Sequence, residues 1–416
     1  MVFDISHALA ATLLETVFDT DLLEERQQPT RCEHGHDVVP SGYRRKTIHT
    51  IFGDIRIRRQ YYYDRACKRG WCPKDRRLDI EGSSFSVGAR RMMAYVGASR
   101  PFQQGREDLY ALAGVTVTTK AIERESHRIG REVEHFLFQQ VSDETSQKLD
   151  AVPAASPAVN AMYICMDGTG VPVVKKETEG RKGKNKEQGA KTREAKLGCV
   201  FTQSTYDAKG YPVRDDSSTS YVGAIEPVEQ FGERLAGEVQ RRNIQIAKAM
   251  IVVGDGAAWI WNLTEQYFRG CVEIIDLYHA REHYWTVARA MYSQSNPKLK
   301  RWTDARKKEL DAGRVEAVVR AIARHHALTD EERKICNTEI QYFQKNKERM
   351  RYNVFRAKGF FVGSGVIEAG CRTLVGQRLK QSGMHWTVNG ANAIIALRCC
   401  LLSNRWEDFW AYRAAA

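Results

Sequence analysis

The sequence predicts a mixed α/β protein, α+β overall: one mixed β-sheet with an α-helical insertion, preceded by a small β-hairpin module and a helical region. Three observations predict this class. Apolar runs of strand length at residues 161–167 and 249–254 each end next to an aspartate. Apolar and polar residues alternate around residues 47–63, as in a hairpin. Charged stretches with helical spacing fill residues 280–352.

The composition indicates a multidomain protein with an anionic partner. A chain of 416 residues is long enough for two or three domains, and 43% hydrophobic residues suit packed cores. The 64 Lys and Arg exceed the 51 Asp and Glu, which gives a net charge of +13. Residues 44–77 carry twelve basic and three acidic residues, a net of +9, and residues 175–196 carry nine and four, a net of +5. Such clusters are typical of surfaces that neutralise phosphates, and a merely solvated surface is the alternative.

The sequence predicts a cytoplasmic, nucleoid-associated location and no membrane partner. Asp4 and Glu15 bracket a short apolar stretch that lacks the basic leader and cleavage pattern of a signal peptide. No eighteen consecutive residues are apolar, so we expect no membrane span. Most of the ten cysteines are isolated in apolar surroundings, which is typical of reduced, buried thiols.

The first two predicted segments are an N-terminal helix at residues 1–30 and a basic β-hairpin module at residues 31–82. The helix follows from apolar residues at helical spacing up to about residue 28. The hairpin follows from the alternation at residues 47–63 around Gly53-Asp54. This module contains two of the candidate DNA contacts, Arg56 and Arg58.

Two clusters of potential metal ligands flank the hairpin. Cys32, His34 and His36 precede it, and Cys67 and Cys72 follow it, so they could meet across it and hold Zn²⁺. The segment contains no Cys-x2-Cys pair, which a zinc ribbon usually has. Unligated cysteines and surface histidines are therefore the alternative.

Residues 83–150 predict a helical region that resembles a helix-turn-helix. Pro101 suits the first turn of a helix, Gly114 suits its end, and a second helix should begin near Thr118. The second helix could lie in a major groove of DNA, although many helical hairpins share this shape. Its candidate DNA contacts are Lys120, Arg124, Arg128 and Arg131. Residues 150–160 have the composition of a linker.

The sheet domain is predicted to begin at residues 151–285, to be interrupted by a helical insertion at 286–354, and to finish at 355–416. Its expected elements are a hairpin of 161–167 with 171–175 through 168–170, a strand at 197–205, a helix at 226–242, and strands at 249–254 and 272–276. Three antiparallel strands, a helix, a parallel strand, a helix and a further strand form the ribonuclease H-like order. In the final helical layer, Ser364 can cap the helix that carries Glu368, and Arg372 lies one turn further on.

Three carboxylates are the candidate catalytic residues. Asp167 and Asp255 each follow an apolar strand, and Glu368 comes from a later helix. Together they could supply the hard oxygen ligands that Mg²⁺ accepts. Carboxylates held together repel one another, and divalent cations relieve that repulsion. An aspartate before glycine is also a common turn former, and a lone glutamate can be helix-surface charge.

The segments that carry these carboxylates resemble those of DDE transposases of bacterial insertion sequences, specifically the ISKra group. The resemblance runs through most of residues 30–410 and rests on Met-Asp-Gly-Thr-Gly-Val-Pro-Val (166–173), Gly-Asp-Gly-Ala-Ala-Trp-Ile-Trp (254–261), Asp-Leu-Tyr-His-Ala-Arg-Glu-His (276–283) and Gly-Ser-Gly-Val-Ile-Glu-Ala-Gly-Cys-Arg (363–372). It implies a ribonuclease H-like core with Asp167, Asp255 and Glu368 as the catalytic triad.

The resemblance also implies cofactors and partners. Two Mg²⁺ or Mn²⁺ ions would be shared by the triad, for hydrolysis at the element's ends and strand transfer into target DNA. The partners would be the terminal inverted repeats, the target DNA and further copies of the chain, as a homodimer or higher oligomer. Asp276-x2-His279 is similar to the C/D-x2-H motif of mutator-type relatives, and Arg372 could support the site. Relatives more often show tight cysteine pairs where this chain has His34, His36 and Asp64.

The remaining candidates and alternatives stay open at this point. Lys182 and Lys184 could contact DNA from the charged loop, and Trp386 could stack on a terminal base or pack in the core. One competing function is an aspartic protease, since Asp167-Gly-Thr-Gly is close to the Asp-Thr-Gly loop of those enzymes. The others are a different ribonuclease H-like nuclease and a non-catalytic DNA-binding derivative.

Overall fold

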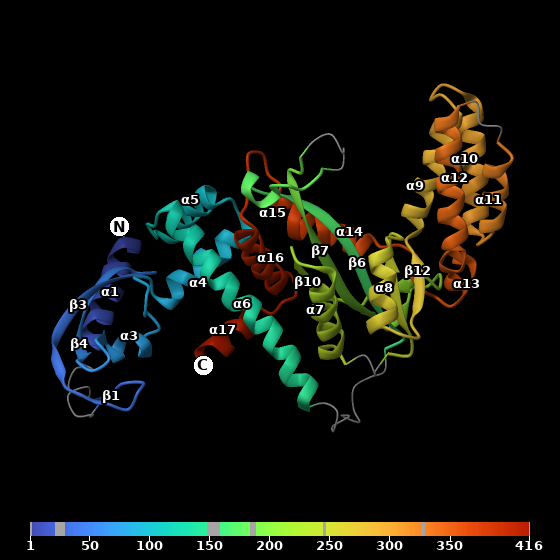
Figure 1. Ribbon diagram of the computed structural model, residues 1–416. Helices are drawn as coiled ribbons and strands as arrows, with labels where there is room; N and C mark the ends of the chain where they lie inside the picture. Colours follow the sequence, from blue (N-terminus) through green and yellow to red (C-terminus); the bar gives the residue numbers. More distant parts are fainter. Residues whose placement is uncertain are drawn as a thin grey trace. The chain divides into compact units, whose positions relative to one another are not determined.

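The computed structural model describes residues 2–20, 30–147, 159–183, 189–243, 247–325 and 329–415 (Figure 1). The chain divides into two compact units, Met1–Gly130 and Arg131–Ala416, and the division falls within the long helix α6 (Thr119–Gln147). Among the described residues, no helix combines the length and the apolar character needed to cross a membrane.

The first unit is built on the predicted hairpin. Strands β3 (Pro40–Thr50) and β4 (Gly53–Asp64) pair antiparallel, and Gly53, with φ of 111°, makes the tight turn between them. β5 (Arg69–Trp71) pairs with the end of β4, and the short strands β1 (Thr30–Arg31) and β2 (Asp37–Val38) pair with each other. Helix α1 (Val2–Thr20) packs against the hairpin core, which contains Ile48, Ile55, Ile57 and Ile80. The expected continuation of this helix, residues 21–28, lies outside the described residues.

Helices form the rest of the first unit. α3 (Pro73–Arg77) was not predicted, since it lies in the segment assigned to the hairpin module. The predicted helical region contains α4 (Val87–Ser99), α5 (Phe102–Ala113) and the start of α6. Gly114 ends α5 in the left-handed conformation, with φ of 64°, and α6 begins at Thr119. Both ends agree with the prediction because proline, glycine and threonine act locally at helix termini.

The second unit contains a five-stranded mixed sheet with the strand order β10-β7-β6-β11-β12. Its strands are β6 (Ala161–Pro172), β7 (Thr192–Gln203), β10 (Ser220–Ala224), β11 (Met250–Gly254) and β12 (Val272–Ile275). β6, β7 and β10 are antiparallel neighbours, whereas β11 is parallel to both β6 and β12. A small ribbon of β8 (Thr205–Tyr206) and β9 (Pro212–Val213) follows β7.

The predicted hairpin of residues 161–167 with 171–175 is wrong. β6 runs straight through residues 168–170 and pairs with β7 along its whole length, from Ala161↔Gln203 to Pro172↔Thr192. Gly168 and Gly170 are not turn residues here. A Cβ at Gly168 would lie 2.7 Å from the Glu194 carboxylate, so glycine leaves room for a side chain of the neighbouring strand. The third antiparallel strand is instead β10, which the sequence did not reveal.

Helices cover both faces of the sheet. On one face Gly198 lies under Leu235 of α7 (Val228–Arg241), and on the other Gly223 lies under Ile395 of α16 (Val388–Leu402). α8 (Ala258–Tyr267) contacts α7. The chain ends with α14 (Gly365–Gly370), a π-helical turn at Cys371–Gly376, α15 (Gln377–Leu379), α16 and α17 (Trp406–Ala415).

The segment between β12 and α14 is helical, and in Figure 1 α10, α11 and α12 lie side by side. Its helices are α9 (Leu277–Met291), α10 (Pro297–Asp311), α11 (Val315–Ala323), α12 (Asp330–Lys345) and α13 (Tyr352–Ala357). The hydroxyl groups of Tyr342 and Tyr352 donate hydrogen bonds to the backbone oxygens of Asp255 (3.1 Å) and Ile275 (3.0 Å). This segment therefore packs against the ends of the parallel strands.

Candidate functional site

Asp167 lies on β6 and faces the layer that holds α14 and α16. Asp167 pairs with Leu197 of β7, and Leu197 pairs in turn with Gly223 of β10. Gly223 lies beneath Ile395 of α16, so Asp167 points to the same face of the sheet. Its Oδ1 accepts a hydrogen bond from the backbone N–H of Gly168 (2.7 Å), and its Oδ2 accepts one from the Cys371 thiol (3.1 Å). Burial, followed by the charge of Asp167, raises the pKa of the Cys371 thiol well above its usual range. Cys371 therefore stays protonated and acts as a donor to this carboxylate.

Asp255 directly follows β11, which ends at Gly254. The last paired residues of β11 and β6 are Val253 and Cys165, so Asp255 and Asp167 each come two residues after that pair. The Oδ1 of Asp255 accepts a hydrogen bond from the backbone N–H of Ala257 (2.8 Å), which orients the carboxylate at the start of α8.

Glu368 lies on α14 and is exposed, and a short chain of hydrogen bonds leads from it to Asp276. The Ser364 hydroxyl donates to Glu368 Oε1 (3.1 Å), and the Ser364 backbone N–H donates to Asp276 Oδ2. The prediction that the Ser364 side chain caps α14 is therefore wrong, because its hydroxyl is turned to the glutamate. α14 has no side-chain cap of its own.

Asp276 connects the end of the edge strand β12 to the starts of α9 and α14. It is fully buried, follows β12 and caps α9, since its Oδ1 accepts a hydrogen bond from the His279 backbone N–H (2.7 Å). Asp276, His279 and Glu368 each offer a ligand atom within 4.8 Å of the others. Across the described residues, the clusters at that spacing do not include Asp167 or Asp255. Asp167, Asp255 and Glu368 are thus not gathered within 4.8 Å of one another. The thiol of Cys371, three residues after Glu368, contacts Asp167.

Arg372 and Trp386 have different surroundings. Arg372 is exposed at the start of the π-helical turn, four residues after Glu368. Trp386 is buried, and its indole N–H donates a hydrogen bond to the Leu379 carbonyl (3.1 Å). The interpretation of Trp386 as a base-stacking residue is therefore wrong, because its ring packs in the core.

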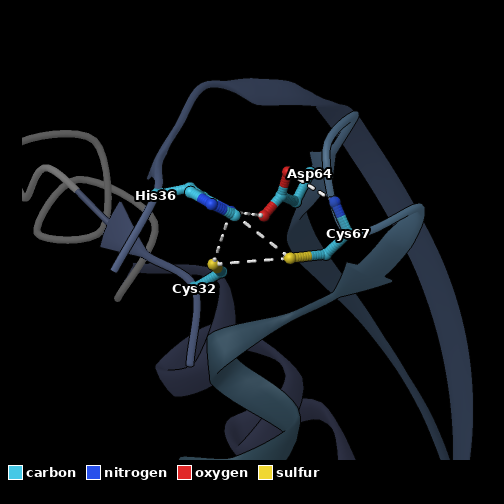
Figure 2. A group of neighbouring side chains, drawn as sticks. All are labelled: Cys32, His36, Asp64 and Cys67. Carbon is cyan, nitrogen blue, oxygen red and sulfur yellow. Dashed lines mark hydrogen bonds and ion pairs between the residues drawn. The ribbon is translucent and has the colours of Figure 1, made fainter. Parts of the chain in front are cut away.

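The first unit contains a compact cluster of metal-ligating side chains (Figure 2). Cys32 Sγ lies 3.9 Å from Cys67 Sγ, and His36 Nδ1 lies 3.4 Å from the first sulfur and 3.3 Å from the second. Asp64 Oδ2 lies 3.0 Å from the same His36 nitrogen. The hydrogen bond with Asp64 raises the pKa of Cys67 to about 12, and the hydrogen bonds from Cys32 and Cys67 lower the pKa of Asp64.

The five predicted zinc ligands do not all enter this cluster. Cys32, His36 and Cys67 do, and His34 touches its edge with Nδ1 3.2 Å from Cys67 Sγ. Cys72 does not belong to it: β5 carries the chain away from Cys67, and Cys72 is buried at the start of α3. Asp64 takes part instead. The sequence feature that could have identified Asp64 as a ligand is its position three residues before Cys67.

The predicted DNA contacts of the hairpin form an exposed basic face. Arg56 and Arg58 are exposed on β4, and Arg45 on β3 lies directly opposite Arg58. The backbone N–H groups of Arg56 and Arg58 donate to Glu15 and Asp19 of α1, so α1 covers the edge of β4 there. A cleft of about 720 Å³ borders the metal-ligating cluster, and sequence reasoning missed its lining of Arg31, Arg69, Arg76, Arg77 and Trp71.

The other predicted DNA contacts are distributed over α6 and the charged loop. Lys120, Arg124 and Arg131 are exposed on α6. Arg128 is half-buried, 3.9 Å from Glu125. Lys182 is exposed, and Lys184 lies outside the described residues.

Comparisons with known proteins identify no family. No protein-family model matches the sequence, and no curated protein matches it. Among solved structures, the chain is similar to the Drosophila P element transposase strand transfer complex, with a TM-score of 0.24 and 8% identity over 81% of this chain and 83% of that one. A TM-score this low does not establish a shared fold.

Proposed function

We propose that this protein is a DDE-type DNA transposase, which binds DNA, cleaves phosphodiester bonds and joins strands with divalent metal ions. Asp167, Asp255 and Glu368 are the proposed catalytic carboxylates. The observation that supports the proposal is the parallel pairing of β6 with β11, because Asp167 and Asp255 each come two residues after the paired residues Cys165 and Val253. Glu368 lies one turn before Cys371, whose thiol contacts Asp167.

The topology of the sheet supports a ribonuclease H-like core. Three antiparallel strands come first in the chain, then α7, the parallel strand β11, α8 and β12. The first strand, β6, lies at the centre of the sheet, so the carboxyl end of β11 emerges beside it. This is the chain order that the sequence predicted, with β10 in place of one expected strand.

The donor atoms fit magnesium or manganese. Carboxylate oxygens are the ligands that these hard cations prefer, and Asp167 and Asp255 are each oriented by a backbone N–H. Divalent cations bound there would supply Lewis acidity toward the phosphodiester and toward the attacking water or 3′-hydroxyl. Carboxylates brought together around such cations would be stabilised by them electrostatically.

Other residues hold the proposed catalytic carboxylates in position. Both oxygens of buried Asp276 accept backbone N–H groups, so this residue is better suited to fixing Ser364 than to binding a metal. Ser364 in turn orients Glu368. His279 lies close enough to Glu368 to act as a polar partner of the bound ion.

A cleavage assay with matched variants tests the proposal. The full chain is incubated with the DNA that flanks its gene, with Mg²⁺, with Mn²⁺ or with a chelator. We expect metal-dependent cleavage by the native chain and by Asp216→Asn, which removes an exposed carboxylate away from the site. Asp255→Ala should bind the same DNA and cleave none of it. Cleavage that persists in Asp255→Ala, or equal loss of its binding and cleavage, overturns the assignment.

Two further readouts separate the competing functions. A nuclease of the same fold would cut DNA without joining its 3′ ends to a target, so strand-transfer products distinguish a transposase. An aspartic protease would cleave peptides in the presence of a chelator, because its paired carboxylates work without metal. We expect joined products and no peptide cleavage.

A further inference from the structure

We propose that Cys32, His36, Asp64 and Cys67 form a tetrahedral Zn²⁺ site that closes the base of the β3–β4 hairpin. The four donor atoms lie within 4.8 Å of one another (Figure 2). They come from two segments, the β1–β2 connection and the end of β4 with the turn that follows it. The proposal does not depend on the proposed transposase activity.

The distances between the donor atoms match a zinc tetrahedron. With Zn–S bonds of about 2.3 Å and Zn–N and Zn–O bonds of about 2.1 Å, ligand atoms are separated by about 3.8 Å for two sulfurs, 3.6 Å for sulfur and nitrogen, and 3.4 Å for nitrogen and oxygen. The observed separations are 3.9 Å between the sulfurs, 3.3 and 3.4 Å from sulfur to His36 Nδ1, and 3.0 Å from that nitrogen to Asp64 Oδ2. One small ion therefore fits among them.

Hydrogen bonds with the backbone around these residues hold the donors in place. Asp64 Oδ1 accepts the backbone N–H groups of Ala66 (2.7 Å) and Cys67 (3.1 Å), which leaves Oδ2 turned to His36. On the other side, Gly35 at φ of 82° makes a tight turn, in which its N–H donates to the Cys32 carbonyl (2.9 Å). The N–H of His34 also donates to Cys32 Sγ (3.3 Å), a contact that stabilises a thiolate.

The mixture of donors selects zinc. Two thiolates, an imidazole and a carboxylate in a tetrahedron suit Zn²⁺, whereas the hard cations Mg²⁺ and Ca²⁺ need more oxygen ligands. A disulfide is a poorer description, since its sulfurs would be about 2.05 Å apart. The sulfurs are 3.9 Å apart, and both cysteines are free.

A zinc ion here would organise the short segment that contains β1 and β2. β1 and β2 contain two residues each, and a ribbon of that size is not stable by itself. The ion would tie Cys32 to Cys67, 35 residues away, next to the cleft lined by Arg69, Arg76 and Arg77. Zinc binding would therefore be coupled to the folding of this segment.

Metal content and cobalt spectra of the full chain test the site. We expect one zinc per native chain, and Co²⁺ replacement should give tetrahedral d–d bands with thiolate-to-metal charge transfer. Asp64→Ala, His36→Ala and Cys67→Ala should lose stoichiometric metal. Asp64→Cys should keep it, with charge-transfer absorption higher by roughly half, because the thiolate ligands rise from two to three. Cys72→Ser is the matched control and should leave the spectrum unchanged.

Several outcomes would overturn the site. Zinc at full occupancy in both Asp64→Ala and His36→Ala, or loss of zinc in Cys72→Ser with retention in Asp64→Ala, would point to another ligand set. If zinc is retained in Asp64→Ala and lost in His34→Ala, the fourth ligand is His34 and not Asp64. Where a cysteine variant does not fold, the cobalt spectrum of the native chain still decides: without thiolate charge transfer, the proposal fails.

Discussion

The thiol of Cys371 donates a 3.1 Å hydrogen bond to Oδ2 of Asp167, although the two residues are 204 positions apart in the chain. This contact connects the π-helical turn after α14 to the central strand β6. Glu368 lies one turn before Cys371, so the same contact sets how close Glu368 comes to Asp167. Movement of this turn would therefore change the distance between the two proposed catalytic carboxylates.

We expect Cys371→Ala to slow metal-dependent DNA cleavage about fivefold to tenfold. The substitution removes one hydrogen bond that orients Asp167, and such a bond contributes about 1 kcal/mol. Cys371→Ser keeps a donor and should retain most of the activity. Single-turnover cleavage rates measure the effect, with Cys336→Ala on α12 as the control for loss of a buried thiol. Full activity of Cys371→Ala would show that the contact does not position Asp167.

We expect Asp276→Ala to destabilise the second unit by roughly 2–4 kcal/mol, because it leaves the backbone N–H groups of His279 and Ser364 without their acceptor in a buried site. Asp276→Asn retains one acceptor oxygen and should cost less. Urea unfolding followed by circular dichroism measures the difference. An unchanged midpoint for the alanine variant would contradict the role of Asp276 as the clamp between α9 and α14.

We expect the basic face of the hairpin to make a salt-dependent contribution to DNA binding. Each phosphate contact that is lost lowers the slope of log affinity against log salt by about 0.9. Arg56→Ala and Arg58→Ala should therefore each reduce the slope by about that amount, whatever the DNA sequence. Fluorescence anisotropy over a range of salt concentrations measures it. Lys209→Ala, in the turn between β8 and β9, is the control, and slopes equal to the native value in the arginine variants would exclude this face.

We expect acid to weaken one ion-pair network of the helical segment. Hydrogen bonds from Arg351 lower the pKa of Glu316 from 4.5 to about 2. A carboxyl whose folded-state pKa is lowered stabilises the fold above its unfolded value, and this stability is lost as the pH falls from 4.5 toward 2. Because Glu316 is about half-exposed, the effect should be near 0.5 kcal/mol. In Glu316→Gln, the free energy of unfolding should depend less on pH in that range. A pH dependence identical to that of the native chain would show that the Glu316–Arg351 pair does not contribute.

Local patterns in the sequence predicted the elements whose signals lie within a few residues. The alternation around Gly53 predicted the β3–β4 hairpin, and Pro101 and Gly114 predicted the bounds of α5. Turn geometry, helix ends and the period of apolar residues depend on neighbours in the chain, so they can be recognised without the fold. The apolar runs before Asp167 and Asp255 also form strands as predicted, although β6 continues past Asp167 to Pro172.

Only the tertiary structure decided which distant residues meet. Gly168 and Gly170 continue β6 because β7 pairs with them, although the same residues would suit a turn. Asp64 rather than Cys72 joins Cys32 and Cys67, and the Ser364 hydroxyl turns to Glu368 instead of capping its helix. The sequence by itself determined the local elements and the residue types available for chemistry. Their convergence depends on strand register and helix packing, which are set by contacts between distant segments, such as that between Asp167 and Cys371, 204 residues apart.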